Sequence, residues 1–132
     1  MITLRSHLFL ENCREALEGY RQIFGGEIRN AQLSDGIEGF KGQEGKYLHA
    51  ELHIKDHCVL YFADVFRPVV QGNQIWLSIE AENDEELTRI FNGLSEGGEV
   101  QMPLEVTFWG AKYGVVKDRN GITWELNLPN TQ

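Results

Sequence analysis

The order of hydrophobic and polar positions along the chain predicts two amphipathic helices of the same design. After Asn12, apolar side chains recur at helical spacing until Gly25-Gly26. After Asn83 they recur in the same way until Gly97-Gly98. Each Asn is followed three residues later by a Glu, which is the arrangement of a capping box. The glycine pairs are typical of helix C-termini, because glycine readily adopts positive φ.

The pattern also predicts that each helix is preceded by one strand and followed by three. Apolar and alternating segments bounded by turn residues place these strands at 2–10, 27–33, 46–54 and 58–63, and again at 74–81, 99–104, 112–116 and 122–128. The two halves, about 1–65 and 74–132, therefore repeat one β-α-β-β-β module, with the helix starts 71 residues apart. A linker of residues 66–73 joins them, and we expect the 132 residues to form a single domain.

This duplication predicts an α+β fold that encloses a cavity. A four-stranded sheet with one helix leaves its second face uncovered. We expect two tandem βαβββ modules to join edge to edge in a curled, eight-stranded mixed sheet, with the helices outside and the inner face around the cavity. An alternative stays open, in which the faces away from the helices are the solvated faces of half-exposed sheets.

The alternation of side chains along the predicted strands identifies the residues that would face the cavity. Successive residues of a strand point to opposite faces of a sheet, so one set packs on the helix and the other points away. In segment 74–81, for example, Ile75, Leu77 and Ile79 are expected to pack on the helix. The set that points away is polar, titratable and partly aromatic, as a ligand pocket requires, and comprises His7, His49, Glu51, His53, Gln74, Trp76, Thr123, Glu125 and Asn127.

The charge of the chain argues against two classes of partner. The net charge is −8, and the Lys and Arg residues are scattered singly, without the basic stripe of a nucleic-acid-binding protein. The same lack of a basic surface argues against an anionic membrane as a partner. No apolar run is long enough to span a bilayer, and the N-terminus lacks the pattern of a signal peptide, so we expect a cytoplasmic protein.

Several motifs spread over nearly the whole chain carry a family resemblance. They lie at 12–20, 24–27, 49–52, 102–104, 107–114 and 118–126, and the most specific are Phe108-Trp109-Gly110 and Asp118-x-x-Gly121-x-x-Trp124. On these motifs the chain resembles the vicinal-oxygen-chelate superfamily, which includes glyoxalase I, bleomycin-resistance proteins, fosfomycin-resistance enzymes and extradiol dioxygenases. The closer resemblance is to its PhnB-like branch. It implies paired βαβββ modules in one glyoxalase/bleomycin-resistance-like domain, often as a homodimer.

The resemblance also implies a metal site. Family ligands come from the first strand, from the strand that opens the second module and from the final strand, and these positions fall on His7, Gln74 and Glu125. The internal repeat would match His7 with Ser78 instead of Gln74. Imidazole nitrogen together with amide and carboxylate oxygens suits a borderline or hard divalent ion with open positions. The sequence leaves the identity of that ion open.

Two functions are compatible with these residues. The first is a metal-assisted lyase, isomerase or transferase acting on a small oxygenated substrate, in which Glu125 binds the ion and Glu51 moves a proton. A rival metal set for this function is His49-x-Glu51-x-His53, because alternate residues of a strand share a face. The second function is metal-free binding and sequestration of a small molecule, for example a cationic aromatic compound, as in bleomycin-resistance relatives.

Either function needs side chains that contact the small-molecule ligand. The candidates are His49, Trp76, Phe108, Trp109 and Tyr113. Some candidates also have a plainer interpretation. His7 would serve as a hydrogen-bonded core histidine, Gln74 as the start of a strand, and the Phe108-Trp109 pair as core or dimer-contact residues.

Overall fold

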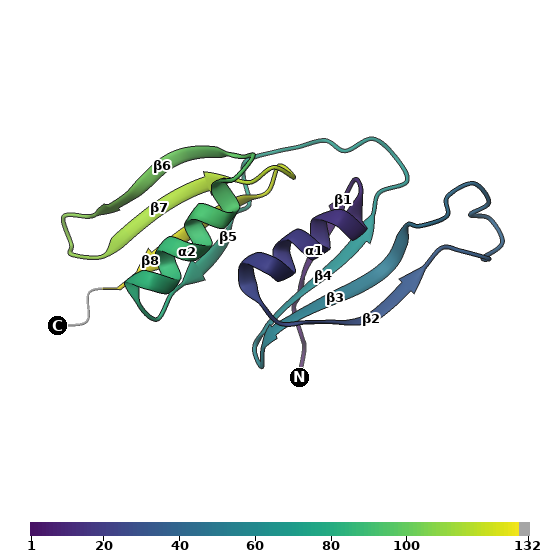
Figure 1. Ribbon diagram of the computed structural model, residues 1–132, viewed down its shortest axis with the longest axis horizontal. Coiled ribbons are helices and arrows are strands. Elements are labelled where there is room, and N and C mark those ends of the chain that lie inside the picture. Colours follow the sequence, from purple (N-terminus) through teal and green to yellow (C-terminus); the bar gives the residue numbers. More distant parts are fainter. Residues whose placement is uncertain (130–132) are drawn as a thin grey trace. The chain divides into compact units, whose positions relative to one another are not determined.

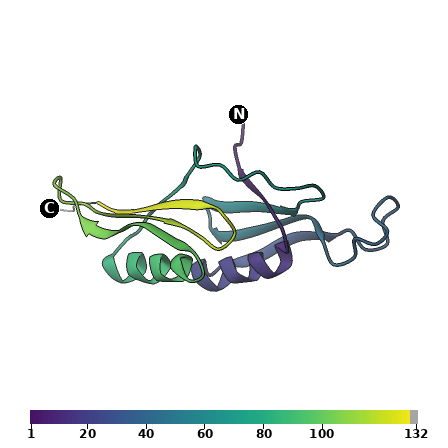
Figure 2. The same ribbon diagram turned by 90° about the horizontal axis from the view of Figure 1, so that it is seen from above.

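The computed structural model describes residues 1–129, and the end of the predicted second module, 130–132, lies outside the described residues. The first half contains β1 (Ser6–Leu10), α1 (Cys13–Phe24), β2 (Glu27–Leu33), β3 (Tyr47–Lys55) and β4 (Cys58–Asp64) (Figure 1). The second half contains β5 (Leu77–Glu80), α2 (Asp84–Ser95), β6 (Glu99–Val106), β7 (Lys112–Lys117) and β8 (Thr123–Leu128). In each half the helix lies along one face of its sheet (Figure 2).

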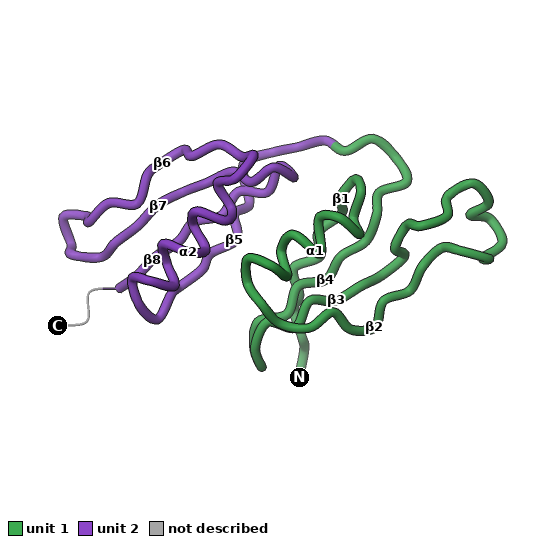
Figure 3. The backbone as a smooth tube through the Cα atoms, viewed as in Figure 1, with its two compact units in different colours: residues 1–69 green, residues 70–132 purple. Residues whose placement is uncertain are grey.

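The two halves are separate compact units, each with one four-stranded mixed sheet. Unit 1 is Met1–Val69 and unit 2 is Val70–Gln132 (Figure 3). The strand order is β1-β4-β3-β2 in unit 1 and β5-β8-β7-β6 in unit 2. In both units the strand before the helix pairs in parallel with the last strand, and the other pairs are antiparallel. The α+β class and the repeated βαβββ module are confirmed, and the strands form two sheets of four.

Each core forms where the apolar face of the helix meets the sheet. In unit 1, Tyr20 of α1 packs on Phe62 of β4, with ring centroids 5.7 Å apart. In unit 2, Leu87 and Leu94 of α2 and Leu126 of β8 are at most 1% exposed. Burying a large apolar side chain stabilises a fold by roughly 1.5–3 kcal/mol, so these contacts fix which face of each sheet is covered.

The two helices begin differently, although the sequence predicts the same capping box for both. At α2 the Asn83 cap is confirmed, because its side chain accepts a 2.8 Å hydrogen bond from the N–H of Glu86, while the Glu86 carboxylate accepts the N–H of Glu82 and not that of Asn83. At α1 the predicted cap is wrong, because Asn12 adopts a left-handed conformation (φ 54°) and its side chain makes no cap bond. Asp64, at the end of β4, instead accepts the N–H of Cys13 at 3.1 Å. A carboxylate at this end also complements the helix dipole.

The glycine pairs after the helices do more than end them. Gly25 and Gly97 have positive φ (78° and 74°), as predicted for a helix end. The second glycine of each pair lies against a strand of the same unit. A Cβ on Gly26 would collide with the carbonyl oxygen of His53, and a Cβ on Gly98 with that of Lys117. Only glycine lets the chain turn from helix to strand so close to the neighbouring backbone.

Strand β5 is shorter than the sequence predicts. It begins at Leu77, and its parallel ladder with β8 starts at the pair Leu77 and Trp124. Residues 74–76 precede the first pair of that ladder. Ile75, expected to pack on the helix, is 86% exposed, and that expectation is wrong. Gln74 also precedes the strand.

Candidate functional site

A row of polar side chains crosses the face of the unit 1 sheet that points away from α1. His7 pairs with Tyr61, Tyr61 with Glu51, and Glu51 with Arg29, so one residue from each strand lies in this row. Their sequence neighbours Phe62 and Leu52 are buried on the helix side. The alternation of side chains therefore places the predicted polar residues of β1 and β3 on one face.

Glu51 is held at the centre of this face by three hydrogen bonds. His49 Nε2 lies 2.8 Å from Glu51 Oε2, His53 Nε2 lies 2.7 Å from Oε1, and Asn30 Nδ2 donates to Oε1 at 3.0 Å. The hydrogen bonds from His49, His53 and Asn30 lower the pKa of Glu51 to about 2, although it is only 8% exposed. An ionised carboxylate only accepts hydrogen bonds, so both Nε2 atoms donate to Glu51.

Asn30 reaches Glu51 because of a local irregularity in β2. The pairing of β2 with β3 shifts register between Arg29 and Gln32, which is a β-bulge. Asn30 lies in this bulge with a positive φ of 52°. Such backbone geometry in a non-glycine residue is uncommon and often occurs at functional positions. Sequence reasoning missed Asn30, and the only available signal was that asparagine tolerates positive φ.

Aromatic and imidazole rings gather beside Glu51 on the same face. His7 stacks on Phe9 with ring centroids 4.3 Å apart, and it meets His49 edge-on at 5.9 Å. His49 in turn contacts Tyr61 edge-on at 4.9 Å. Burial, and next to it the nearby His49, lowers the pKa of His7. These four residues, the ring cluster, combine apolar ring faces with nitrogen atoms that can donate or accept a proton.

The corresponding face of unit 2 carries Glu125. Glu125 pairs with Ser78 of β5 and with Val115 of β7, so Ser78, and not Gln74, is its register neighbour. Burial raises the pKa of Tyr113, and the nearby charge of Glu125 raises it further.

The remaining predicted ligand contacts lie at the surface of unit 2. Trp76 is 41% exposed and donates its indole N–H to the carbonyl of Asn73 at 2.9 Å. Phe108 and Trp109 occupy the turn between β6 and β7, with their rings edge-to-face at 4.7 Å. They are 98% and 57% exposed, so they are not core residues of unit 2.

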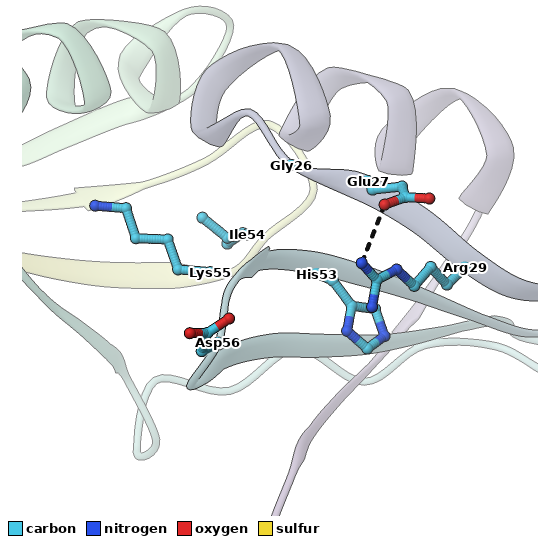
Figure 4. A pocket seen from close by; sticks show the side chains of 7 residues that line it. All are labelled: Gly26, Glu27, Arg29, His53, Ile54, Lys55 and Asp56. Carbon is cyan, nitrogen blue, oxygen red and sulfur yellow. Dashed lines mark hydrogen bonds and ion pairs between the residues drawn. The ribbon is translucent and has the colours of Figure 1, made fainter.

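A cavity of about 390 Å³ opens at the end of the same unit 1 face (Figure 4). Its lining comes from the start of β2, the end of β3 and the turn after it, and consists of Gly26, Glu27, Arg29, His53, Ile54, Lys55 and Asp56. Among these residues, sequence reasoning identified only His53. The charged neighbours Glu27 and Arg29 went unnoticed because their position depends on the register between β2 and β3, which the sequence pattern does not specify.

The donor types of the predicted metal ligands suit a divalent ion, but their placement does not form a set within one unit. His7 belongs to unit 1, whereas Gln74 and Glu125 belong to unit 2, where they are not register neighbours. In the rival set, Glu51 is bonded directly to both imidazoles. Within residues 1–129, no three His, Cys, Asp or Glu side chains are arranged to hold a metal ion. The ligand set His7, Gln74 and Glu125 stays a prediction.

The paired βαβββ modules, with their polar faces turned away from the helices, are the arrangement that the resemblance implies. The model of the Glyoxalase/Bleomycin resistance protein/Dioxygenase superfamily matches residues 4–126, and the chain belongs to that superfamily. Within it, the chain is PhnB-like. It is 26% identical to the PhnB protein from Bacillus cereus, with a TM-score of 0.80 over 97% of this chain and 100% of that one.

Two further relatives agree with this placement. The structure of protein PA1353 from Pseudomonas aeruginosa is 32% identical, with a TM-score of 0.87 over 99% of this chain and 100% of that one. Protein YjdN from Escherichia coli K12 is 24% identical over 136 residues, which cover 94% of this chain and 92% of YjdN.

Within residues 1–129, neither helix has the length and apolar character needed to cross a membrane.

Proposed function

We propose that the chain binds a small planar molecule, for example a cationic aromatic compound, on the polar faces of its sheets and sequesters it without a metal ion. The observation that carries this proposal is the ring cluster of His7, Phe9, His49 and Tyr61. The guanidinium of Arg5 already lies 6.0 Å from the centre of the Tyr61 ring, so that ring accommodates a cation. The net charge of −8 would assist the capture of a cationic ligand.

The predicted closure of the fold belongs to this proposal. In it, the two modules form one domain in which the sheets curl as eight strands around a cavity, and the chain is a cytoplasmic homodimer. The ring cluster would line one side of the cavity, and Trp76, Tyr113 and the Phe108-Trp109 pair would contribute from unit 2. Sedimentation equilibrium should then give twice the mass of 15.1 kDa, whereas a monomer would contradict the dimer.

Within this site, Glu51 serves to position His49. A carboxylate with a pKa of about 2 is a weak base, so it is poorly suited to accept a proton near neutral pH. By accepting from His49 Nε2, it fixes the tautomer and turns Nδ1 toward any ligand on that side of the ring. If a bound ligand is also transformed, we propose that His49 takes the proton.

The test is calorimetric titration of a panel of planar aromatic cations into the full chain. We expect Tyr61→Leu to weaken binding about 10-fold, since one desolvated cation–π contact contributes about 1–2 kcal/mol. The matched control is Phe66→Leu, which removes another aromatic ring of unit 1, 44% exposed and outside the ring cluster. Absence of binding across the panel, or an equal loss in both variants, would overturn the proposal.

A metal-assisted reaction on a small oxygenated substrate is the second candidate. It is favoured by membership of the superfamily and by Glu125, whose carboxylate lies near Tyr113 on the face away from α2. Elemental analysis of protein purified without chelator or nickel resin tests it. Under this second candidate, bound metal is lost in Glu125→Gln and retained in Glu105→Gln, an exposed Glu of β6. No bound metal, and no thermal shift with Mn, Ni, Zn or Fe, would contradict it.

A further inference from the structure

In the cavity at the end of β3, the carboxylate of Glu27 already pairs with the guanidinium of Arg29. Arg29 Nη2 lies 3.1 Å from Glu27 Oε2, and the two side chains are 53% and 67% exposed. Ion pairs this exposed are weak, so another carboxylate can replace that of Glu27 on the guanidinium. The planar fork of Arg suits a carboxylate in particular. Figure 4 shows the guanidinium of Arg29 beside the ring of His53.

The charges around the cavity select for a ligand with a single negative charge. Arg29 and Lys55 are positive and Glu27 and Asp56 are negative, so these four charges balance. Displacement of Glu27 from Arg29 exposes one cation to the ligand. A polyanion such as a polyphosphate would still meet two carboxylates in the same small space. The lining therefore matches a small monocarboxylate.

His53 connects this cavity to the ring cluster. It lines the cavity, and its Nε2 lies 2.7 Å from Glu51 Oε1, while Glu51 Oε2 lies 2.8 Å from His49 Nε2. The groups facing His53 are Glu51 and Lys55 on its own strand, Glu27 and Arg29 on β2, and the apolar Val59 on β4. A ligand that contacts His53 shifts the position of its ring, and because Glu51 accepts hydrogen bonds from both imidazoles, a change in the bond to His53 also changes the bond to His49.

We propose that this cavity is a binding site for a small monocarboxylate, recognised by Arg29 with His53 at the cavity wall, and that Glu51 transmits its occupancy to His49. The transmission step rests on the proposed function, because it gives His49 a role in ligand binding. The carboxylate site itself stands on the cavity and its lining.

The experiment is a titration of sodium acetate into the full chain at constant ionic strength. It is monitored by NMR through the ring resonances of the four histidines. Acetamide, the neutral isostere, is titrated in parallel. We expect His53 and His49 to shift with one saturating dissociation constant for acetate and to stay unchanged with acetamide. Arg29→Gln should weaken acetate binding at least 10-fold. Arg21→Gln should not, because Arg21 pairs with Glu18 on α1, away from the cavity.

Glu51→Gln separates binding from transmission. In this variant we expect acetate to shift His53 as before and to leave His49 unmoved. The amide resonance of Cys13, bonded to Asp64, reports whether unit 1 is still folded. Equal responses to acetate and acetamide, or no saturable shift at His53, would overturn the carboxylate site. A His49 shift that survives in Glu51→Gln would overturn transmission. Tyr61→Leu should leave the His53 response intact, so failure of the aromatic-ligand proposal is distinguishable.

Discussion

At the scale of single residues, three buried carboxylates differ in the kind of hydrogen-bond donor that they accept. Glu51 accepts only side-chain donors, from two imidazoles and one amide, on a face open to ligands. Asp64 accepts two backbone N–H groups, those of Cys13 and Tyr47. Asp118 accepts the N–H of Asn120 and Ile122 and the indole N–H of Trp124. The last two therefore hold turns and helix ends in place, and Glu51 organises histidines.

The lowered pKa of Glu51 predicts how the free energy of unfolding changes at acidic pH. The folded-state pKa of Glu51, about 2, lies below the ordinary glutamate value of 4.5, so this group stabilises the fold above pH 4.5. The contribution is lost as the pH falls from 4.5 toward 2, because the folded state must then give up its charged form. We expect Glu51→Gln to flatten the decline in unfolding free energy over this window. Urea unfolding of both proteins between pH 6 and 2.5 measures it, and parallel curves would contradict the assignment.

Asp64 provides the corresponding structural prediction. In Asp64→Asn one acceptor oxygen is replaced by an NH₂ group that would face a backbone N–H, and the free energy of unfolding should fall by about 1–3 kcal/mol. The control is Asp35→Asn, because Asp35 also accepts a backbone N–H, that of Gly45, but in an exposed loop. We expect the control to lose much less in urea unfolding. Equal losses would mean that burial at the α1 terminus is unimportant.

Some of these residues could be predicted from the sequence and others could not. Period-two alternation was enough to place His7, His49, Glu51 and His53 on the face away from the helix. The network needed Asn30 as well, and no alternation pattern predicts a residue that sits in a bulge. The cap of α1 was mispredicted for a related reason, because its acceptor, Asp64, is distant in sequence and reaches Cys13 only through tertiary contact.

At the scale of elements, the helix-to-strand junctions are the positions least tolerant of change. Gly98→Ala would press a Cβ into the carbonyl oxygen of Lys117 and within 3.1 Å of that of Leu94. Because both atoms belong to the backbone, the strand must shift, and we expect a loss of about 1–3 kcal/mol in unfolding free energy. The matched control is Gly19→Ala in α1, where nothing lies within 4 Å. There we expect a gain of about 0.5–1 kcal/mol from helix propensity. Chemical denaturation measures both, and a neutral Gly98→Ala would refute the close approach.

The existence and order of the elements followed from periodicity, whereas several ends did not. Helix spacing and glycine pairs bounded α1 and α2 closely. The start of β5 was placed three residues early because an apolar residue, Ile75, continued the alternation. The ladder between β5 and β8 begins only at the pair Leu77 and Trp124, and the alternation pattern does not indicate where a ladder begins. In that register Ser78, four residues after Gln74, lies opposite Glu125.

At the scale of the whole molecule, the sequence indicates one domain while the chain has two compact units. The duplication was visible because both modules use the same helix start and glycine pair. Packing decides how far the two units stabilise one another. Local sequence patterns do not predict this dependence. The distribution of tryptophan makes this dependence measurable, because Trp76, Trp109 and Trp124 all lie in unit 2.

We expect unit 1 and unit 2 to unfold as one cooperative domain. In a Trp76→Phe, Trp109→Phe background the remaining Trp124 is 2% exposed, so its emission follows unit 2 alone. If folding is cooperative, Asp64→Asn in unit 1 should lower the urea midpoint of Trp124 emission as much as that of the circular dichroism of the whole chain. Gly98→Ala in unit 2 is the positive control, since it must lower the emission midpoint in either case. The opposite result would be an unchanged midpoint of Trp124 emission in Asp64→Asn together with a separate transition in circular dichroism. It would show two independent folding units and contradict the single-domain proposal.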